Sequence, residues 1–160
     1  MTPERKQAVK AWIAAGLWLG LIAIESTSYA SAANTGRFLY PLFHFIFGVS
    51  VAGFASWNGH LRKIGHFVGY FTLSLLMFRA WKNTWPSPGR NWSWRWAAVA
   101  FVVAAGVASL DEWHQTFLPS RTGTIHDVIL DSTAALAAQA VIYMIITRRT
   151  EALNRSRRTW

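Results

Sequence analysis

Long apolar stretches separated by short polar segments run through the chain, which has 160 residues. The stretches cover residues 9–27, 38–57, 64–82, 94–112 and 127–147. Each is close to the roughly 20 residues that an α-helix needs to cross the hydrocarbon core of a bilayer. The pattern therefore predicts an all-α integral membrane protein, folded as a single domain over residues 1–160.

The second stretch, 38–57, differs from the others in composition. It contains Pro41, Gly48 and Gly53 together with His44 and several aromatic residues. Its length allows a spanning helix, but proline and glycine interrupt helices. Such a composition is also typical of an interfacial or re-entrant segment.

The distribution of basic residues decides between these alternatives. They flank the first helix, the connection between 64–82 and 94–112, and the C-terminal end: Arg5, Lys6, Lys10, Arg79, Lys82, Arg90, Arg95, Arg148, Arg149, Arg155, Arg157 and Arg158. The connection before 127–147 carries only Arg121. Positively charged flanks stay in the cytoplasm, so both termini lie inside and the number of crossings is even. We predict a four-helix transmembrane bundle, a non-spanning segment at 38–57 on the outer face and a basic cytoplasmic tail at 148–160.

Composition supports a membrane location. Hydrophobic residues make up 52% of the chain and charged residues 14%, against roughly 25% charged residues in soluble domains. The formal net charge of +9 is explained by topology and by anionic membrane lipids rather than by nucleic acid. The chain has no cysteine, which excludes disulfides and zinc–thiolate sites. The first stretch resembles a signal peptide, but the spans that follow favour a retained helix.

Ionisable and polar side chains gather near the predicted outer end of the bundle. Lys63, His66 and Tyr70 are spaced i, i+3 and i+7, which places them on one face of their helix. Glu112 and Gln115 are spaced i, i+3 near the end of the next helix. An ionisable group at membrane depth costs several kcal/mol unless it is paired or hydrated, so such groups indicate function.

The following turn and the last helix contribute further polar groups. Arg121 follows Pro119, which ends the preceding helix. Asp127 and Asp131 are one turn apart on one face of the last helix. Topology and spacing thus place eight residues at one level. We interpret three as hypothetical catalytic residues, Glu112, Asp131 and His66, and five as substrate-binding residues, Lys63, Tyr70, Gln115, Arg121 and Asp127.

Several of these residues also have purely structural interpretations. Asp127 fits a helix N-cap or a partner of the helix dipole. Arg121 fits an ion pair with Asp127 or Glu112 that locks the turn. Tyr70 fits a packed core residue whose hydroxyl bonds to a neighbour. Asp111 is interpreted as a solvated loop residue.

Metal and cofactor motifs are weak or absent. A metal site is conceivable at His66, Glu112, His114 and Asp127, because imidazole and carboxylate groups are metal ligands. There is no HExxH sequence, however, and the spacing of two between Glu112 and His114 does not place them on one helical face. P-loop, GxSxG and GxGxxG patterns do not occur. We therefore predict no metal and no cofactor.

Three motifs occur in a characteristic order, namely Lys63-x-x-His66-x-x-x-Tyr70, Asp111-Glu112-x-x-Gln115-x-x-x-Pro119-x-Arg121 and Asp127-x-x-x-Asp131. This combination resembles the VanZ-like family of bacterial membrane proteins, over roughly residues 63–138. Two features depart from the family pattern. Asp131 stands where the family often has Asn, and Ala134 and Ala138 stand where it often has Gly. Alanines four residues apart still permit close helix contact.

The resemblance implies a multi-pass protein of the bacterial cytoplasmic membrane that influences susceptibility to teicoplanin-type glycopeptides. It also implies partners in the cell envelope, namely lipid-linked cell-wall precursors or the glycopeptide itself, and leaves room for an oligomer. Three hypotheses stay open. The protein is a non-enzymatic envelope factor, a membrane-embedded enzyme acting on a lipid-linked or phospholipid headgroup, or a small proton-coupled transporter or flippase.

Overall fold

The computed structural model describes residues 1–87, 91–119 and 121–158 and is helical throughout its regular parts. Five α-helices and one short 3-10 helix follow one another along the chain: α1 (Pro3–Glu25), η1 (Ser28–Ala30), α2 (Ala32–Phe47), α3 (Val51–Thr84), α4 (Trp94–Gln115) and α5 (Ile125–Arg158). The described residues contain no strand. The prediction of an all-α protein is therefore confirmed.

Helix starts are set by short polar side chains in the sequence. Thr2, Ser50 and Ser93 each accept a hydrogen bond from a backbone N–H in the first turn of α1, α3 and α4, respectively. In α1 the following residue is Pro3, whose fixed φ angle suits the first helical position. Such caps satisfy backbone donors that have no partner within the helix.

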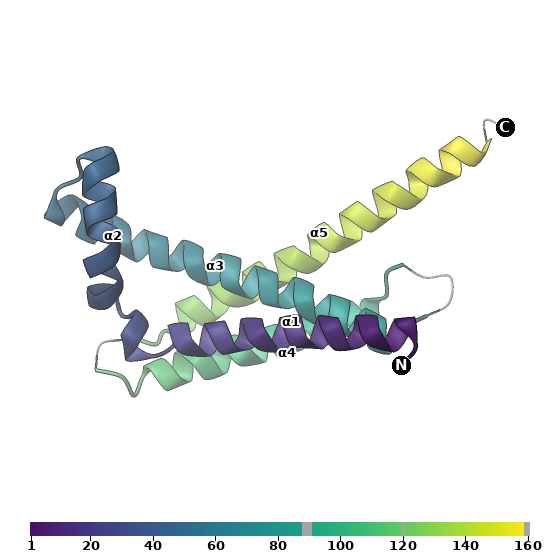
Figure 1. Cartoon of the computed structure of the whole chain (residues 1–160), viewed down its shortest axis with the longest axis horizontal. Coiled ribbons are helices and arrows are strands. Elements are labelled where there is room, and N and C mark those ends of the chain that lie inside the picture. Colours follow the sequence, from purple (N-terminus) through teal and green to yellow (C-terminus); the bar gives the residue numbers. More distant parts are fainter. Residues whose placement is uncertain (88–90, 120, 159–160) are drawn as a thin grey trace.

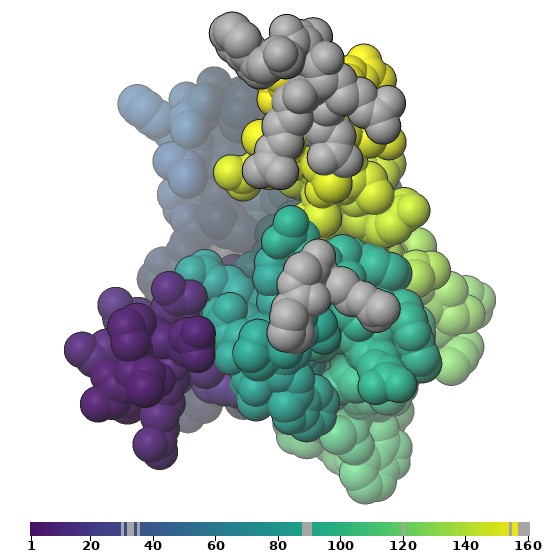
Figure 2. All heavy atoms as spheres, turned by 90° about the vertical axis from the view of Figure 1, so that its right-hand side faces the viewer, coloured from purple at the N-terminus to yellow at the C-terminus, as the bar shows by residue number. Residues whose placement is uncertain are grey.

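Helix α3 lies at the centre of the fold and packs against α1, α4, α5 and α2. Helices α1, α3, α4 and α5 run back and forth along the long axis, so that both termini lie at the same end of the molecule (Figure 1). Helix α2 and the connection from α4 to α5 lie at the opposite end. Figure 2 views the terminal end, with the first turns of α1 and the last turns of α5 on the same face.

Small residues bring the helices into close contact. Ala100, Ala104 and Ala108 form a fully buried row on α4, and Ala134 and Ala138 are fully buried on α5. Residues four apart lie above one another on a helix, and the lack of bulk lets the backbones approach closely. The small-residue packing expected at positions 134 and 138 is therefore present.

The segment 38–57, predicted as one apolar element, is divided between two helices. Gly48 adopts a left-handed conformation with φ of 64°, ends α2 and donates its N–H to the carbonyl of His44. Ser50 then starts α3, and the two helices are bent by 115° at this break. The third helix consequently begins at Val51 rather than near residue 64, because a left-handed glycine followed by a serine cap ends one helix and starts another.

The remaining helices are longer than the apolar stretches that predicted them. Helix α1 begins at residue 3 instead of 9, and α4 ends at 115 instead of 112. Helix α5 spans 125–158, so the predicted basic tail at 148–160 continues the helix up to residue 158. An apolar stretch marks the part of a helix that suits lipid, whereas the polar residues at the helix ends do not extend that stretch. Arg90, counted above among the basic flanks, lies outside the described residues.

Among the described residues, three helices are long and apolar enough to cross a membrane: α1, α4 and residues Ile125–Leu153 of α5. The bent pair formed by Gly36–Phe47 and Val51–Thr84 is long and apolar enough to span when the two helices are taken together. The protein has up to four spans if this pair is one broken span rather than a re-entrant element. The protein is thus a helical membrane protein, as predicted.

Candidate functional site

A buried hydrogen-bonded group joins α3 and α4 near the end of the bundle that carries α2. The hydroxyl of Tyr70 donates to Asp111 Oδ2 at 2.9 Å, and Gln115 Nε2 donates to Asp111 Oδ1 at 3.1 Å. All three side chains are buried. The interpretation of Asp111 as a solvated loop residue is therefore wrong. Helix α4 continues to residue 115, and the four-residue spacing turns Asp111 and Gln115 toward the same neighbour.

His66 and Asp131 link α3 to α5 beside this group. His66 Nδ1 lies 3.1 Å from Asp131 Oδ2 and 3.9 Å from Glu112 Oε1. Asp131 is 0% exposed, and its other oxygen, Oδ1, has no hydrogen-bond partner. The His66 side chain is 21% exposed. One imidazole therefore contacts two buried carboxyl groups while keeping an exposed edge.

Glu112 anchors the connection between α4 and α5. Its Oε2 accepts a hydrogen bond from the backbone N–H of Thr124 at 2.9 Å. The Thr124 side chain in turn caps α5, because its Oγ1 accepts from the Asp127 N–H at 3.2 Å and donates to Asp127 Oδ2 at 2.9 Å. The cap is therefore Thr124, so the interpretation of Asp127 as the N-cap is wrong. Asp127 lies in the first turn of α5, at the positive end of the helix dipole, which is the other structural role considered for it.

Arg121 does not form the predicted ion pair with Asp127 or Glu112. Its Nη2 donates to the backbone carbonyls of Glu25 and, at 3.0 Å, of Thr27. These carbonyls lie at and just after the end of α1, where carbonyl groups lack helical partners. Burial lowers the pKa of the Arg121 guanidinium below its ordinary value, and the charge of Arg62 lowers this pKa further. The Arg121 Nε–H is buried without a partner.

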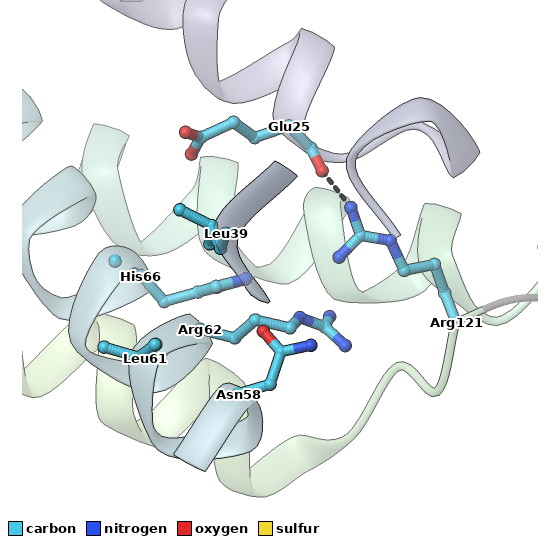
Figure 3. Close-up of a pocket in the computed structure, with 8 residues that line it drawn as sticks. Glu25, Leu39, Asn58, Leu61, Arg62, His66 and Arg121 are labelled. Carbon is cyan, nitrogen blue, oxygen red and sulfur yellow. Dashed lines mark hydrogen bonds between the residues drawn. The ribbon is translucent and has the colours of Figure 1, made fainter. Parts of the chain in front are cut away.

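Two pockets meet at His66 and Arg62. One, of about 210 Å³, lies between α2, α3 and Arg121 and is lined by Glu25, Leu39, Asn58, Leu61, Arg62, Gly65, His66 and Arg121. Figure 3 shows Arg62 and Arg121 approaching it from different elements, while the carboxylate of Glu25 points away from Arg121. The other, of about 160 Å³, is lined by Gly59, Arg62, Lys63, His66, Glu112, Gln115, Thr122 and Asp127.

The structure brings all eight predicted residues together through these contacts. Two residues that the sequence analysis did not include also belong to the site, Arg62 and Asp111. Arg62 precedes His66 by four residues and Tyr70 by eight, so a search of both the i+3 and i+4 faces would have found it. Of the metal ligands considered, His114 instead contacts the hydroxyl of Ser26, with Nδ1 and Oγ 3.1 Å apart.

The site has two chemically different halves. Arg62, Lys63 and Arg121 line its mouth, and guanidinium groups bind phosphate or carboxylate. Carboxyl groups and an imidazole form its base, and they are suited to moving a proton or holding a cation. Among the described residues, one ring nitrogen of His66 and one oxygen each of Asp111 and Glu112 lie within 4.8 Å of one another.

Comparison with known proteins gives one match. The family model described as VanZ/LLP1 matches residues 11–147, which is most of the chain. The match includes α3 and α4 in full, most of α1 and α5, and every residue of the site. No curated protein and no solved structure matches the chain.

Proposed function

The chain belongs to the VanZ/LLP1 family, and from this premise and the site geometry we propose that it is a cell-envelope protein that binds a phosphate-bearing lipid headgroup. The headgroup of a lipid-linked cell-wall precursor is the partner that connects this activity to susceptibility to teicoplanin-type glycopeptides. The observation that carries the proposal is the convergence of Arg62 and Arg121 on one pocket.

The lack of a nearby carboxylate at these arginines supports an anionic ligand. Arg121 is only 7% exposed, yet within the described chain no carboxylate lies within 4.0 Å of it or of Arg62. A buried cation without a counter-charge is costly. A phosphate group between the two guanidinium groups would supply that charge and would accept from the free Nε–H of Arg121.

The surroundings of the pocket suit a lipid. Leu39 of α2 and Leu61 of α3 line it beside the arginines. Helix α2 also exposes large apolar side chains, including Phe38 (82%), Phe45 (88%) and Phe47 (66%). Such a helix lies in the membrane interface, where headgroups and the upper parts of acyl chains are found. A ligand with a phosphate and an apolar chain matches both linings.

The orientation of the protein is part of the proposal. Basic flanks place the termini in the cytoplasm of a bacterial cell and the pocket at the outer face of the cytoplasmic membrane. Because the chain has no cysteine, single cysteines report sidedness directly. In intact cells, a membrane-impermeant maleimide should label Thr122→Cys and should label Glu151→Cys only after the membrane is opened. The reverse pattern would refute the orientation.

Headgroup binding is tested with protein reconstituted in nanodiscs that contain phosphatidylglycerol or an undecaprenyl-diphosphate-linked precursor. Arg62→Gln should weaken binding about tenfold or more, because a charge-assisted hydrogen bond contributes about 1.5–3 kcal/mol. Arg121→Lys keeps the charge but loses the planar fork and should weaken binding too. Arg79→Gln is the matched control, an exposed arginine 17 residues further along α3.

Two outcomes would overturn the proposal. In the binding assay, equal affinities of Arg62→Gln and Arg79→Gln for the lipid headgroup would show that the pocket is not the binding site. In a susceptible host, wild-type protein should raise resistance to a teicoplanin-type glycopeptide, and Arg62→Gln should not. A host with unchanged susceptibility in spite of verified lipid binding would refute the antibiotic connection alone.

A headgroup-processing enzyme is a second candidate function, favoured by the contact of His66 with Asp131. The buried carboxyl group orients an imidazole that also lines both pockets, as a general base requires. The test is release of phosphate or of a headgroup fragment from the same lipids. Release by wild-type protein that is abolished in Asp131→Asn supports an enzyme, and unchanged lipid after prolonged incubation rejects it.

A further inference from the structure

The acidic half of the site lacks a matching positive charge. Asp111, Glu112 and Asp131 are 8%, 4% and 0% exposed. Within the part of the chain that the structure describes, the only ion pairs closer than 4.0 Å that they form are the two with His66. No lysine or arginine of that part lies within the same distance. Three carboxyl groups therefore have one imidazole as their only nearby basic group, in a poorly hydrated place where uncompensated charge is unfavourable.

The geometry of the cluster is close to that of a metal site. Ligand atoms of His66, Asp111 and Glu112 all lie within 4.8 Å of one another. In a tetrahedral site, nitrogen and oxygen ligands about 2.0–2.2 Å from an ion lie about 3.3–3.6 Å apart. The side chains would therefore have to move closer together by at most about 1.5 Å to close around an ion. The hydrogen bonds that Asp111 accepts are compatible with this, because each carboxylate oxygen has two lone pairs.

Asp131 provides a second and independent indication of a cation. Its Oδ2 lies 3.1 Å from His66 Nδ1. A carboxylate that holds one ring nitrogen orients an imidazole for an ion at the other, so the ion would bind at Nε2 of His66. Oδ1 of Asp131 belongs to the same fully buried carboxyl group and has no partner. A buried carboxylate oxygen without a donor calls for an explanation, and an ion bound beside this carboxyl group would supply the positive charge that it lacks.

We propose that His66, Asp111 and Glu112 bind a divalent transition-metal cation, such as Zn²⁺ or Mn²⁺, with Asp131 holding the imidazole and balancing the charge. Imidazole selects for Zn²⁺ and similar ions, and carboxylates also accept Mn²⁺. The three ligands leave coordination positions for water or for a ligand in the pocket that His66 and Glu112 line. This proposal goes beyond headgroup binding and does not rest on it.

The test uses the full chain, purified in detergent through a tag without histidine and treated with EDTA. After equilibration with Zn²⁺ or Mn²⁺ and removal of free ion, plasma mass spectrometry gives the ions bound per chain. Wild-type protein should retain one. Asp111→Asn and His66→Gln should lower retention at least tenfold, whereas His126→Gln, an exposed histidine in the first turn of α5, should not.

A second measurement guards against variants that do not fold. On wild-type protein alone, adding the ion after EDTA treatment should raise the thermal unfolding temperature, because a ligand that binds the native state stabilises it. Loss of ion binding in Asp111→Asn together with a rise in wild-type protein supports the site. Wild-type protein that retains no ion and shows no rise overturns it, as does Asp111→Asn that binds like wild type.

The outcome is separable from that of the proposed function. Arg62→Gln should lose headgroup binding and keep the ion. A retained ion without any headgroup binding by wild-type protein would refute the proposed function alone. Full headgroup binding by a protein that never binds an ion would refute the metal site alone.

Discussion

The connection between α4 and α5 has no space for a side chain at Gly123, and the substitution Gly123→Ala tests the arrangement around Glu112. A Cβ atom there would overlap the backbone carbonyl oxygen of Glu112 and would lie 3.0 Å from Thr116 Cγ2. Because the overlapping atom belongs to the backbone and not to a flexible side chain, the connection around Gly123 must move away from α4. The φ angle of Gly123 is not positive, so the effect is purely steric.

The expected magnitude follows from the hydrogen bond next to the clash. Thr124 N lies 2.9 Å from Glu112 Oε2. Relief of the overlap needs a retreat of about 1 Å, which takes this distance past the limit of about 3.2 Å for a good N–H···O bond. Loss of a bond to a charged acceptor costs about 1.5–3 kcal/mol, and overpacking costs about 1–3 kcal/mol. Because the two terms share one movement, we expect a total of about 2–4 kcal/mol.

Thermal unfolding in detergent, followed by circular dichroism, measures this effect. For a chain of this size each kcal/mol shifts the midpoint by about 2–4 °C, so Gly123→Ala should unfold about 4–16 °C below wild type. The matched control is Gly106→Ala in α4, which has no atom within 4 Å of the added Cβ. It should be neutral or slightly stabilising, because alanine favours helix more than glycine. Equal midpoints for the two variants would show that the connection is placed wrongly.

Three further substitutions test other parts of the structure by the same measurement. Tyr70→Phe removes the buried bond to Asp111 and should cost about 1–2 kcal/mol, whereas Tyr143→Phe, 48% exposed, should cost nothing measurable. Ser74→Ala removes hydrogen bonds between α3 and α5 and should cost about 1 kcal/mol; a wild-type midpoint would contradict that contact. Gly48→Ala places a Cβ at a φ of 64° and should cost about 1–2 kcal/mol, without altering ion binding.

The long helices could be predicted from the sequence because apolar length is a direct requirement of the bilayer. The break at Gly48 could not be located in this way. Hydropathy runs without interruption from Phe38 to Trp57, whereas the break depends on one left-handed residue and the cap at Ser50. Both signals were present in the sequence, but a glycine and a serine within an apolar stretch are also common in spanning helices.

Helical spacing predicted most of the site and failed at specific points. Asp111 and Gln115 are spaced i, i+4, but Glu112 and Gln115 at i, i+3 gave an equally good face, and only the rotation of α4 against α3 shows that both acids are buried. The partners of Arg121 were unpredictable for a different reason. A guanidinium can bind backbone carbonyls instead of carboxylates, as Arg121 does at the end of α1. A sequence does not show where those carbonyls lie.

The basic and the acidic halves of the site lie close together but do not neutralise each other. Arg62 and Arg121 are close enough to the cluster to share a pocket wall with His66, yet they do not pair with Asp111 or Glu112. If they formed ion pairs with these carboxyl groups, neither the arginines nor the acids would be free to bind a ligand. Kept apart, the arginines retain affinity for an anion and the carboxyl groups retain affinity for a cation.

If both ligands bind, they should strengthen each other's binding. A divalent cation at His66 and Glu112 would attract the phosphate of a headgroup held by Arg62, and coupling of this kind is reciprocal. Phosphatidylglycerol should then bind several-fold more tightly in the presence of Zn²⁺ or Mn²⁺ than after EDTA treatment, and the lipid should raise the affinity for the ion by the same factor. The coupling should vanish in Arg62→Gln, even though the ion still binds. Equal lipid affinities with and without bound ion would show that the two halves act independently.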